Sequence, residues 1–323
     1  MASFAIVTKA SSAIGFGHLT RCEALRNALL ENGHQAILIL NNTDVTRALV
    51  GTENVHFSDE CSLVDWPTAD VCVLDIYGFP HWFVEELKTY YSQIICFDDY
   101  RFDVPAGVSA VINVNIYAKP EHYPKSVKAF AGPQYFLLRQ DLGVDGSTDQ
   151  RENIFVCMGG SDPEGQTDRI LRILTGISTK SIDAVFGPGF EDDRVVEFWK
   201  EIKGVTVHRN PSDIGQLMGR AEYAVCGAGT MLYELSYMGT PAACLSLIDH
   251  QRLVAESFAD HHAALNLGNF SEITSTAIEV NLARFDQDKK QRDSIKYRAH
   301  QMIDGSGASR LVRDLSTWLG IEM

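Results

Sequence analysis

A histidine near the N-terminus follows two glycines at a point where a strand should give way to a helix. The segment reads SSAIGFGHLTR, from Ser11 to Arg21, and comes soon after the first apolar run. Glycine lets the backbone approach a ligand closely, and such turns lie at the sheet edge where α/β proteins bind ligands. Because a helix N-terminus disfavours an imidazolium, we expect His18 to act as a neutral general base. The alternative is a Gly-rich turn in which this histidine only caps the helix.

Polar side chains end other strands expected in the first half of the chain. The turn after the first strand is not a dinucleotide-binding fingerprint, because Thr20 replaces the third glycine of the GxGxxG pattern. Hydroxyl, amide and carboxylate groups at the ends of the later strands suit a sugar that carries hydroxyl and amide groups. The expected sugar-binding residues are Ser12, Gly15, Gly17, Arg21, Asp75, Tyr77, Asn115 and Tyr117.

An acidic pair, Asp98-Asp99, ends another of these strands. Two adjacent carboxylates could hold Mg²⁺. No further acid stands at a suitable spacing, so we favour a structural or hydrogen-bonding role and predict no metal site.

Two Gly-rich turns in the second half could bind a nucleotide. Each follows a buried apolar run and leads into a helix, so that backbone N–H groups and the helix N-terminus suit a phosphate. Glu234 lies about one turn into the second helix, where it could accept hydrogen bonds from a ribose. The alternative is two ordinary turns and a solvated helix charge. We predict a nucleotide diphosphate bound by Gly159, Gly160, Ser161, Gly227, Gly229, Thr230, Glu234 and Gln251.

Apolar runs of strand length alternate with helix-period segments along the whole chain. The runs are continuous, as in parallel strands that are covered on both faces. The predicted strands are Phe4–Val7, Gln35–Leu40, Val71–Ile76, Gln93–Phe97, Ala110–Ile112, Ile154–Met158, Ala184–Phe186, Val205–His208, Tyr223–Cys226 and Ala242–Leu245. The predicted helices are Leu19–Glu31, Trp82–Tyr91, Thr167–Leu174, Thr230–Tyr237 and Ala308–Leu319.

This pattern predicts an α/β protein with two Rossmann-type βαβ domains whose parallel sheets face an interdomain cleft. The polar, Gly- and Ser-rich stretch near 144–150 is the expected linker. The domains would be 1–143, on the sugar and catalytic side, and 151–323, which binds the nucleotide. The pattern of the last helix does not indicate which domain it packs on.

Composition excludes several classes of function. The 323 residues include 28 basic and 42 acidic side chains, a net charge of −14, which disfavours nucleic-acid binding. Seven cysteines without a CxxC pair indicate reduced thiols. Neither a signal peptide nor an apolar run long enough for a membrane span is present, so we expect a cytoplasmic protein with no membrane partner.

The motifs resemble, in order and spacing, the PseG family of nucleotide-sugar hydrolases of pseudaminic acid biosynthesis and the related SpsG-type spore coat polysaccharide proteins. They are SSxIGFGHxxRCxxL, LDIYG, FDDY, NVNxYA, GPQYFLLRxDL, CMGGSDPxxxT and GAGTMLYELxxMGTP, over about residues 1–265. The broader relatives are MurG-like glycosyltransferases. The resemblance implies a GT-B-like fold without metal or cofactor.

The resemblance also implies a substrate and roles for residues. The substrate would be UDP-2,4-diacetamido-2,4,6-trideoxy-β-L-altropyranose, cleaved by water to UDP and free sugar. The essential histidine would be His18, and the nucleotide-binding segment Gly227–Glu234. Lys9 and Ala13 depart from the family pattern, in which an acidic residue is common at the first position and a polar or acidic one at the second.

Two other classes of function remain open. One is a glycosyltransferase that uses the same loops and an acceptor hydroxyl instead of water. The other is a non-catalytic nucleotide-sugar-binding partner. The sequence does not indicate the oligomeric state.

Overall fold

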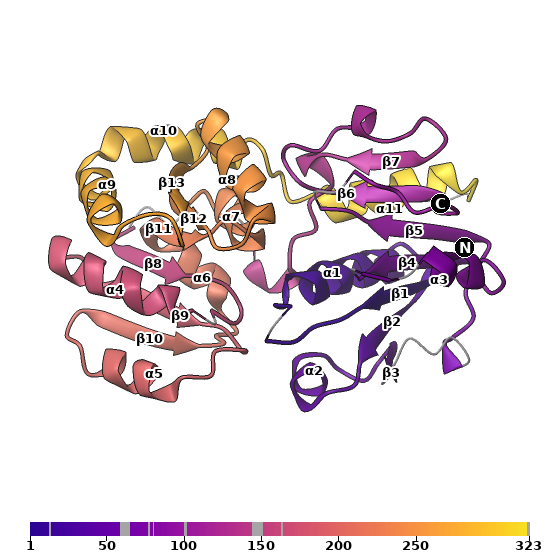
Figure 1. Ribbon diagram of the computed structural model, residues 1–323, viewed down its shortest axis with the longest axis horizontal. Coiled ribbons are helices and arrows are strands. Elements are labelled where there is room, and N and C mark those ends of the chain that lie inside the picture. The colour runs from indigo at the N-terminus through magenta and orange to yellow at the C-terminus, as the bar shows by residue number, and fades with distance from the viewer. Residues whose placement is uncertain are drawn as a thin grey trace. The chain divides into compact units, whose positions relative to one another are not determined.

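The computed structural model divides the chain into two compact units (Figure 1). It describes residues 1–12, 14–58, 65–76, 78–79, 81–99, 102–143, 151–162 and 164–321. Unit 1 comprises Met1–Arg139 and Gly305–Met323, and unit 2 comprises Gln140–Asp304.

Unit 1 contains a parallel sheet of seven strands among its described residues, in the order β3-β2-β1-β4-β5-β6-β7. The strands are β1 (Ser3–Thr8), β2 (Gln35–Asn41), β3 (Val55–Ser58), β4 (Val71–Asp75), β5 (Gln93–Phe97), β6 (Ala110–Asn113) and β7 (Lys128–Ala131). Its helices are α1 (Gly17–Glu31), α2 (Asp44–Leu49), α3 (His81–Leu87) and α11 (Gly307–Trp318). Short 3₁₀ turns, η2 (Pro120–His122) and η3 (Pro133–Tyr135), flank β7.

Unit 2 contains a parallel sheet of six strands within its described part, in the order β10-β9-β8-β11-β12-β13. The strands are β8 (Asn153–Cys157), β9 (Ile182–Phe186), β10 (Val205–Arg209), β11 (Ala221–Gly227), β12 (Ala242–Ser246) and β13 (Leu265–Asn269). The helices are α4 (Gln166–Ile177), α5 (Asp193–Lys200), α6 (Ile214–Gly219), α7 (Thr230–Tyr237), α8 (His250–Asp260), α9 (Ser275–Gln287) and α10 (Lys289–His300), with a 3₁₀ turn η4 (Gln140–Leu142) before them.

Each sheet has one point at which the order of its strands reverses. In unit 1 this point lies between β1 and β4, and in unit 2 it lies between β8 and β11. The loops that leave two such strands run to opposite faces of the sheet, which leaves room for a ligand at their carboxyl ends. We therefore expect ligand-binding sites at the carboxyl ends of β1 and β4 in unit 1, and at the carboxyl ends of β8 and β11 in unit 2.

The C-terminal helix corrects the predicted domain boundaries. We expected domains 1–143 and 151–323, but α11 packs against α1 and belongs to unit 1, and Gln140–Leu142 belongs to unit 2. The helix Ala308–Leu319 itself was predicted. Its Leu311, Val312 and Leu315 are buried, which explains why it needs a partner surface. The predicted linker, 144–150, lies outside the described residues.

Six of the seven cysteines can be described, and all six are buried free thiols, as expected: Cys22, Cys72, Cys96, Cys157, Cys226 and Cys244. Cys61 lies outside the described residues. Among the helices that the structure describes, none is both long and apolar enough to cross a membrane.

Candidate functional site

The start of the loop between β1 and α1 is held in place by hydrogen bonds from the last residue of the neighbouring strand, β2. Asn41, the last residue of β2, accepts a hydrogen bond from the Ala10 N–H (2.8 Å) and donates one to the Ala10 carbonyl (2.9 Å). The chain then turns back on itself, with the Gly15 N–H donating to the Ser11 carbonyl (2.8 Å). Gly15 has a φ of +86°, which a residue with a side chain rarely adopts. This turn starts α1 at Gly17 and puts His18 in its first turn, as predicted.

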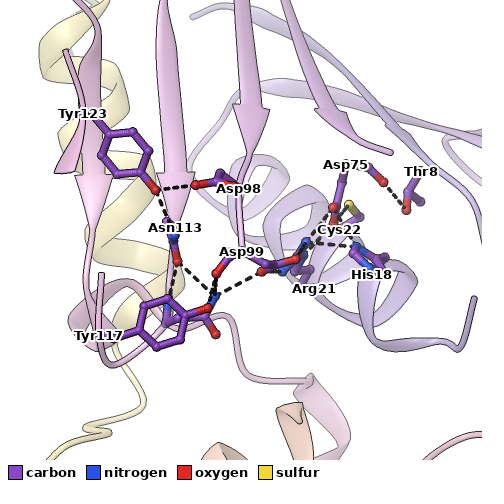
Figure 2. Close-up of polar contacts among 11 residues, drawn as sticks. Thr8, His18, Arg21, Cys22, Asp75, Asp98, Asp99, Asn113, Tyr117 and Tyr123 are labelled. Atoms are coloured by element: carbon purple, nitrogen blue, oxygen red, sulfur yellow. Dashed lines mark hydrogen bonds and ion pairs between the residues drawn. The ribbon is translucent and has the colours of Figure 1, made fainter. Parts of the chain in front are cut away.

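The imidazole of His18 faces a buried carboxylate across the reversal point of the sheet. Asp75, the last residue of β4, is paired in register with Thr8, the last residue of β1. Its Oδ1 lies 2.8 Å from His18 Nδ1 (Figure 2). Burial alone would raise the pKa of Asp75, but Arg21 and then His18 lower it below its ordinary value. Asp75 is therefore an ionised carboxylate, which can accept a hydrogen bond from the imidazole when Nδ1 carries the proton.

Arg21 follows His18 by one helical turn and holds the same carboxylate. Its Nε donates to Asp75 Oδ2 (2.6 Å), and its Nη2 donates to Asp75 Oδ1 (2.6 Å). The other side of the guanidinium donates to Asp99, from Nη1 to Oδ1 (2.7 Å) and from Nη2 to Oδ2 (2.9 Å). Burial would lower the pKa of Arg21, but the two carboxylates outweigh it and raise that pKa. Arg21 is thus a permanent cation that bridges two aspartates.

Asp99 is in turn held by residues that follow β6. The Asn115 side-chain amide donates to Asp99 Oδ1 (3.1 Å), and the Tyr117 hydroxyl donates to the Asp99 carbonyl. Asn113, the last residue of β6, accepts from the Asn115 side chain at 2.9 Å. One connected network thus runs along the carboxyl ends of β4, β5 and β6 (Figure 2).

Asp98 takes a different partner from its neighbour. Its Oδ2 accepts from the Tyr123 hydroxyl (2.8 Å) and from the Phe102 N–H (3.1 Å), and the Asn113 amide donates to the same hydroxyl (2.8 Å). Burial and then Asp98 raise the pKa of Tyr123, so its hydroxyl keeps its proton. The acidic pair has the expected hydrogen-bonding role. The described residues contain no group of three or more His, Cys, Asp or Glu side chains arranged to hold a metal ion.

The structure brings together five of the nine residues predicted for the sugar and the catalysis. These are His18, Arg21, Asp75, Asn115 and Tyr117. The other described ones, Ser12, Gly15 and Gly17, form the turn that leads to His18, and Tyr77 lies outside the described residues. Sequence reasoning missed Asn41 and Tyr123. Asn41 could have been predicted in the same way as Asp75, because both are polar residues at the end of an apolar run. No pattern in the sequence indicates Tyr123.

In unit 2, the loop after β8 packs closely against the loop after β9. Gly159 has a φ of +117°. A Cβ on Gly187 would lie 2.4 Å from the Gly160 carbonyl oxygen, and the Gly189 N–H donates to that same oxygen (2.8 Å). The contact of the two backbones therefore requires glycine at Gly187, whereas Gly159 is favoured by its positive φ.

The N-terminus of α4 is already capped by the chain's own carboxylate. Asp162 accepts from the Gln166 N–H (2.7 Å) and from the Thr167 N–H (2.8 Å). Burial raises the pKa of Asp162 even though these amides lower it. The amides that we expected to face a phosphate at this helix are in part occupied, which leaves the loop Gly159–Ser161 as the part of this segment that could bind one.

The N-terminus of α7 differs from that of α4. The N–H groups of Gly229, Thr230 and Met231 donate no hydrogen bond to any of the described residues. Gln251 lies beside this turn, since a Cβ on Gly229 would come within 3.4 Å of its Nε2. Glu234 is only 3% exposed, so the alternative of a solvated helix charge is wrong. Of the predicted residues, Gly227 thus ends β11, and Gly229, Thr230, Glu234 and Gln251 lie on the turn before α7, on α7 or beside that turn.

Comparison with known proteins supports the same fold. The sequence is 26% identical to the spore coat polysaccharide biosynthesis protein SpsG of Bacillus subtilis over 261 residues, 75% of this chain and 75% of SpsG. Acinetobacter baumannii MurG superposes over 98% of this chain and 99% of its own, with a TM-score of 0.66 at 14% identity. The chain has the GT-B fold, and its sequence is similar to that of SpsG. The predicted fold class and the resemblance to SpsG-type proteins are confirmed.

Two further GT-B structures extend this comparison. The spinosyn forosaminyltransferase SpnP has a TM-score of 0.68 at 15% identity and covers 99% of either chain. Arabidopsis thaliana UGT89C1, solved in complex with UDP, has a TM-score of 0.67 at 12% identity over 99% of this chain and all of its own. No protein-family model matches the chain.

Proposed function

We propose that this chain is an inverting UDP-sugar hydrolase that releases UDP and a free sugar, with His18 as the general base. The observation that carries the proposal is the hydrogen bond between His18 Nδ1 and the ionised, buried Asp75. An imidazole that donates from Nδ1 to a carboxylate has its lone pair on Nε2, the nitrogen that then accepts a proton.

The proposed reaction is a single displacement. Nε2 of His18 takes a proton from water while the water oxygen attacks the anomeric carbon. The bond between that carbon and the diphosphate oxygen breaks, its electron pair leaves with UDP, and the configuration inverts. Asp75 stabilises the imidazolium that forms, and general-base assistance of this kind contributes about 10²–10⁴ in rate.

Unit 2 is proposed to bind the nucleotide. The α7 N-terminus offers the N–H groups of Gly229, Thr230 and Met231, and the glycines after β8 lie at the same reversal point of the sheet. Amide donors and the helix dipole stabilise negative charge on a departing diphosphate. UDP is the nucleotide bound in the UGT89C1 structure, which has the same fold. Glu234 is proposed to accept hydrogen bonds from the ribose.

The sugar is proposed from the resemblance to the PseG family as a 2,4-diacetamido-2,4,6-trideoxy-β-L-altropyranosyl group. A role in glycan biosynthesis agrees with the name of SpsG, a spore coat polysaccharide biosynthesis protein. Lys9 is exposed at the end of β1, so its charge stands near the loop that leads to His18. A substrate screen should therefore include related diacetamido sugars.

A glycosyltransferase is the second candidate, because SpnP, a transferase by name, shares the fold. The discriminating experiment measures UDP release from the UDP-sugar by the full chain, with and without an acceptor. We expect release without an acceptor. Release that occurs only with an acceptor hydroxyl would favour the transferase instead, and no release with bound UDP-sugar would favour a binding protein.

The role of His18 is tested in the same assay. We expect His18→Ala to lower kcat by about 10²–10⁴ and to leave the Kd for UDP unchanged, because the nucleotide binds to unit 2. The matched control is His261→Ala, which changes an exposed histidine at the end of α8. Full activity of His18→Ala would contradict the proposal.

A further inference from the structure

The surroundings of His18 Nδ1 contain two groups that require opposite tautomers. Asp75 Oδ1, at 2.8 Å, can only accept, and so requires a proton on Nδ1. Arg21 Nη2, at 2.9 Å, can only donate, and so requires a lone pair on Nδ1. A neutral imidazole can satisfy one of them. The choice matters for the function proposed above, on which this inference rests, because only the tautomer protonated on Nδ1 has a basic Nε2.

The hydrogen atoms of Arg21 decide between the two tautomers. Nη2 carries two hydrogens, and two carboxylate oxygens lie within hydrogen-bond distance of it: Asp75 Oδ1 at 2.6 Å and Asp99 Oδ2 at 2.9 Å. An ionised carboxylate is a stronger acceptor than a neutral imidazole nitrogen. Both hydrogens are therefore taken, and Nδ1 of His18 is left to donate to Asp75.

We propose that Asp99 is a positioning residue that selects the catalytic tautomer of His18 by occupying the second Nη2 hydrogen of Arg21. Without Asp99, Nδ1 of His18, which lies 2.9 Å from Nη2, is an acceptor within reach of that hydrogen. The proton of the imidazole then moves to Nε2, which can no longer accept one. Water is a poor substitute for Asp99, because the side chain of Arg21 is only 9% exposed.

The proposal assigns a new role to two residues that we expected to bind the sugar. Asn115 donates to Asp99 Oδ1, and Tyr117 donates to the Asp99 carbonyl. Asn115 thus holds the carboxylate of Asp99 and Tyr117 holds its backbone, next to the two Nη groups of Arg21 that donate to it. Asp99 therefore connects the end of β6 to the base on α1 without itself touching the reacting atoms.

The first test reads the tautomer directly and needs no substrate. The full chain is labelled with heavy nitrogen in its ten histidines, and the nitrogen chemical shifts of His18 are measured by NMR at alkaline pH. The His18 signals are assigned by their loss in His18→Gln. We expect Nδ1 to carry the proton in the wild type and Nε2 to carry it in Asp99→Ala. A wild type protonated on Nε2, or an unchanged tautomer in Asp99→Ala, would overturn the proposal.

The second test compares two substitutions of Asp99. We expect Asp99→Ala to lose about 10²–10⁴ in kcat with KM little changed. Asp99→Leu fills the same space without an acceptor, so we expect it to show the same loss of kcat and the same change of tautomer. A purely structural role for Asp99 predicts instead that Asp99→Leu, which leaves no cavity, keeps kcat and the wild-type tautomer.

The two proposals fail in different ways. If the wild type releases no UDP but the tautomer changes in Asp99→Ala, the hydrolase is refuted and the role of Asp99 stands. If the wild type hydrolyses UDP-sugar and Asp99→Ala keeps full kcat, the hydrolase stands and the role of Asp99 is refuted. Should Asp99→Ala fail to fold, the tautomers of the wild type and of Asp99→Leu still decide.

Discussion

At the scale of single residues, the chemistry of unit 1 depends on a charge that the fold keeps out of water. Asp75 is 3% exposed and shares its Oδ1 between Arg21 and His18. A buried carboxylate is costly unless it is paired and fully hydrogen-bonded. The cost is offset by Arg21, which also fixes where the carboxylate points. The orientation of His18 and the stability of the fold therefore both depend on the side chain of Asp75.

This linkage predicts a pH-dependent loss of stability in Asp75→Asn. Removing the charge leaves Arg21 buried with one partner fewer, which should cost about 3–5 kcal/mol at neutral pH. Because the pKa of Asp75 is lowered in the folded state, its contribution is complete above the pKa of an unfolded aspartate, about 3.9, and is lost as pH falls through the folded value. Urea unfolding at a series of pH values should show the wild type and the variant converging below about pH 4. Asp260→Asn, on the exposed end of α8, is the control. A stability gap that stays constant with pH would contradict this account.

In unit 2, a substitution of Glu234 tests the proposed binding of the ribose. If its carboxylate accepts from the ribose, Glu234→Gln should weaken UDP binding by about tenfold to a hundredfold, as expected for a hydrogen bond to a charged group. Calorimetry with UDP and with a uridine diphosphate that lacks the ribose hydroxyls separates this effect from a general disturbance of α7. An equal loss of affinity for both nucleotides would argue against ribose recognition.

At the scale of elements, both candidate sites lie where loops leave neighbouring strands at a reversal of strand order. His18 follows β1 and Asp75 ends β4, and the two Gly-rich turns of unit 2 follow β8 and β11. The sequence predicts the turns themselves, because mainly apolar runs lead into Asp75, Gly227 and, just after β8, Gly159. The order of the strands, and with it the two reversal points, could not be predicted from the sequence.

Other elements could not be predicted in this way. β13 reads LNLGN, and β7 is only four residues long, so neither forms an apolar run. The cap of α4 by Asp162 depends on a φ of +43° that no local pattern signals. Tyr123 reaches Asp98 across the sheet from a segment that follows a 3₁₀ turn. These features depend on contacts between segments that are far apart in sequence, and a single sequence does not encode them in its local pattern.

The attachment of α11 gives a prediction at this scale. A Cβ on Gly307, in the first turn of α11, would lie 2.1 Å from the Phe136 carbonyl oxygen. We expect Gly307→Ala to destabilise the protein by about 1–3 kcal/mol through overpacking. Gly176→Ala, at a helical glycine of α4 with no atom within 4 Å of the added Cβ, should be tolerated. Equal stability of the two variants in urea unfolding would contradict the contact.

At the scale of the whole molecule, the chain leaves unit 1 after Arg139 and returns to it at Gly305. The amphipathic pattern of α11 predicts a buried face but does not name the surface that covers it, which is why the domain boundary was wrong. His34 and Ser316 hold the returning segment through a hydrogen bond of 3.1 Å between Nε2 and Oγ. Unit 1 is thus completed by the last residues of the chain.

The net charge of −14 bears on the nucleotide. A surface of this sign repels a diphosphate at long range. Binding must therefore depend on short-range donors, and the uncapped N-terminus of α7 provides them while that of α4 is capped by Asp162. We therefore propose that α7 and the glycine loop after β8 have the main part in holding the diphosphate.

The central claim is that water, activated by His18, attacks the anomeric carbon of a UDP-sugar. The most direct measurement incubates the protein with the UDP-diacetamido sugar in heavy-oxygen water, without metal or acceptor, and analyses both products by mass spectrometry. The account predicts heavy oxygen at C1 of the free sugar, unlabelled UDP, and loss of both products in His18→Ala. Heavy oxygen in UDP, or release of UDP only when an acceptor hydroxyl is added, would contradict it.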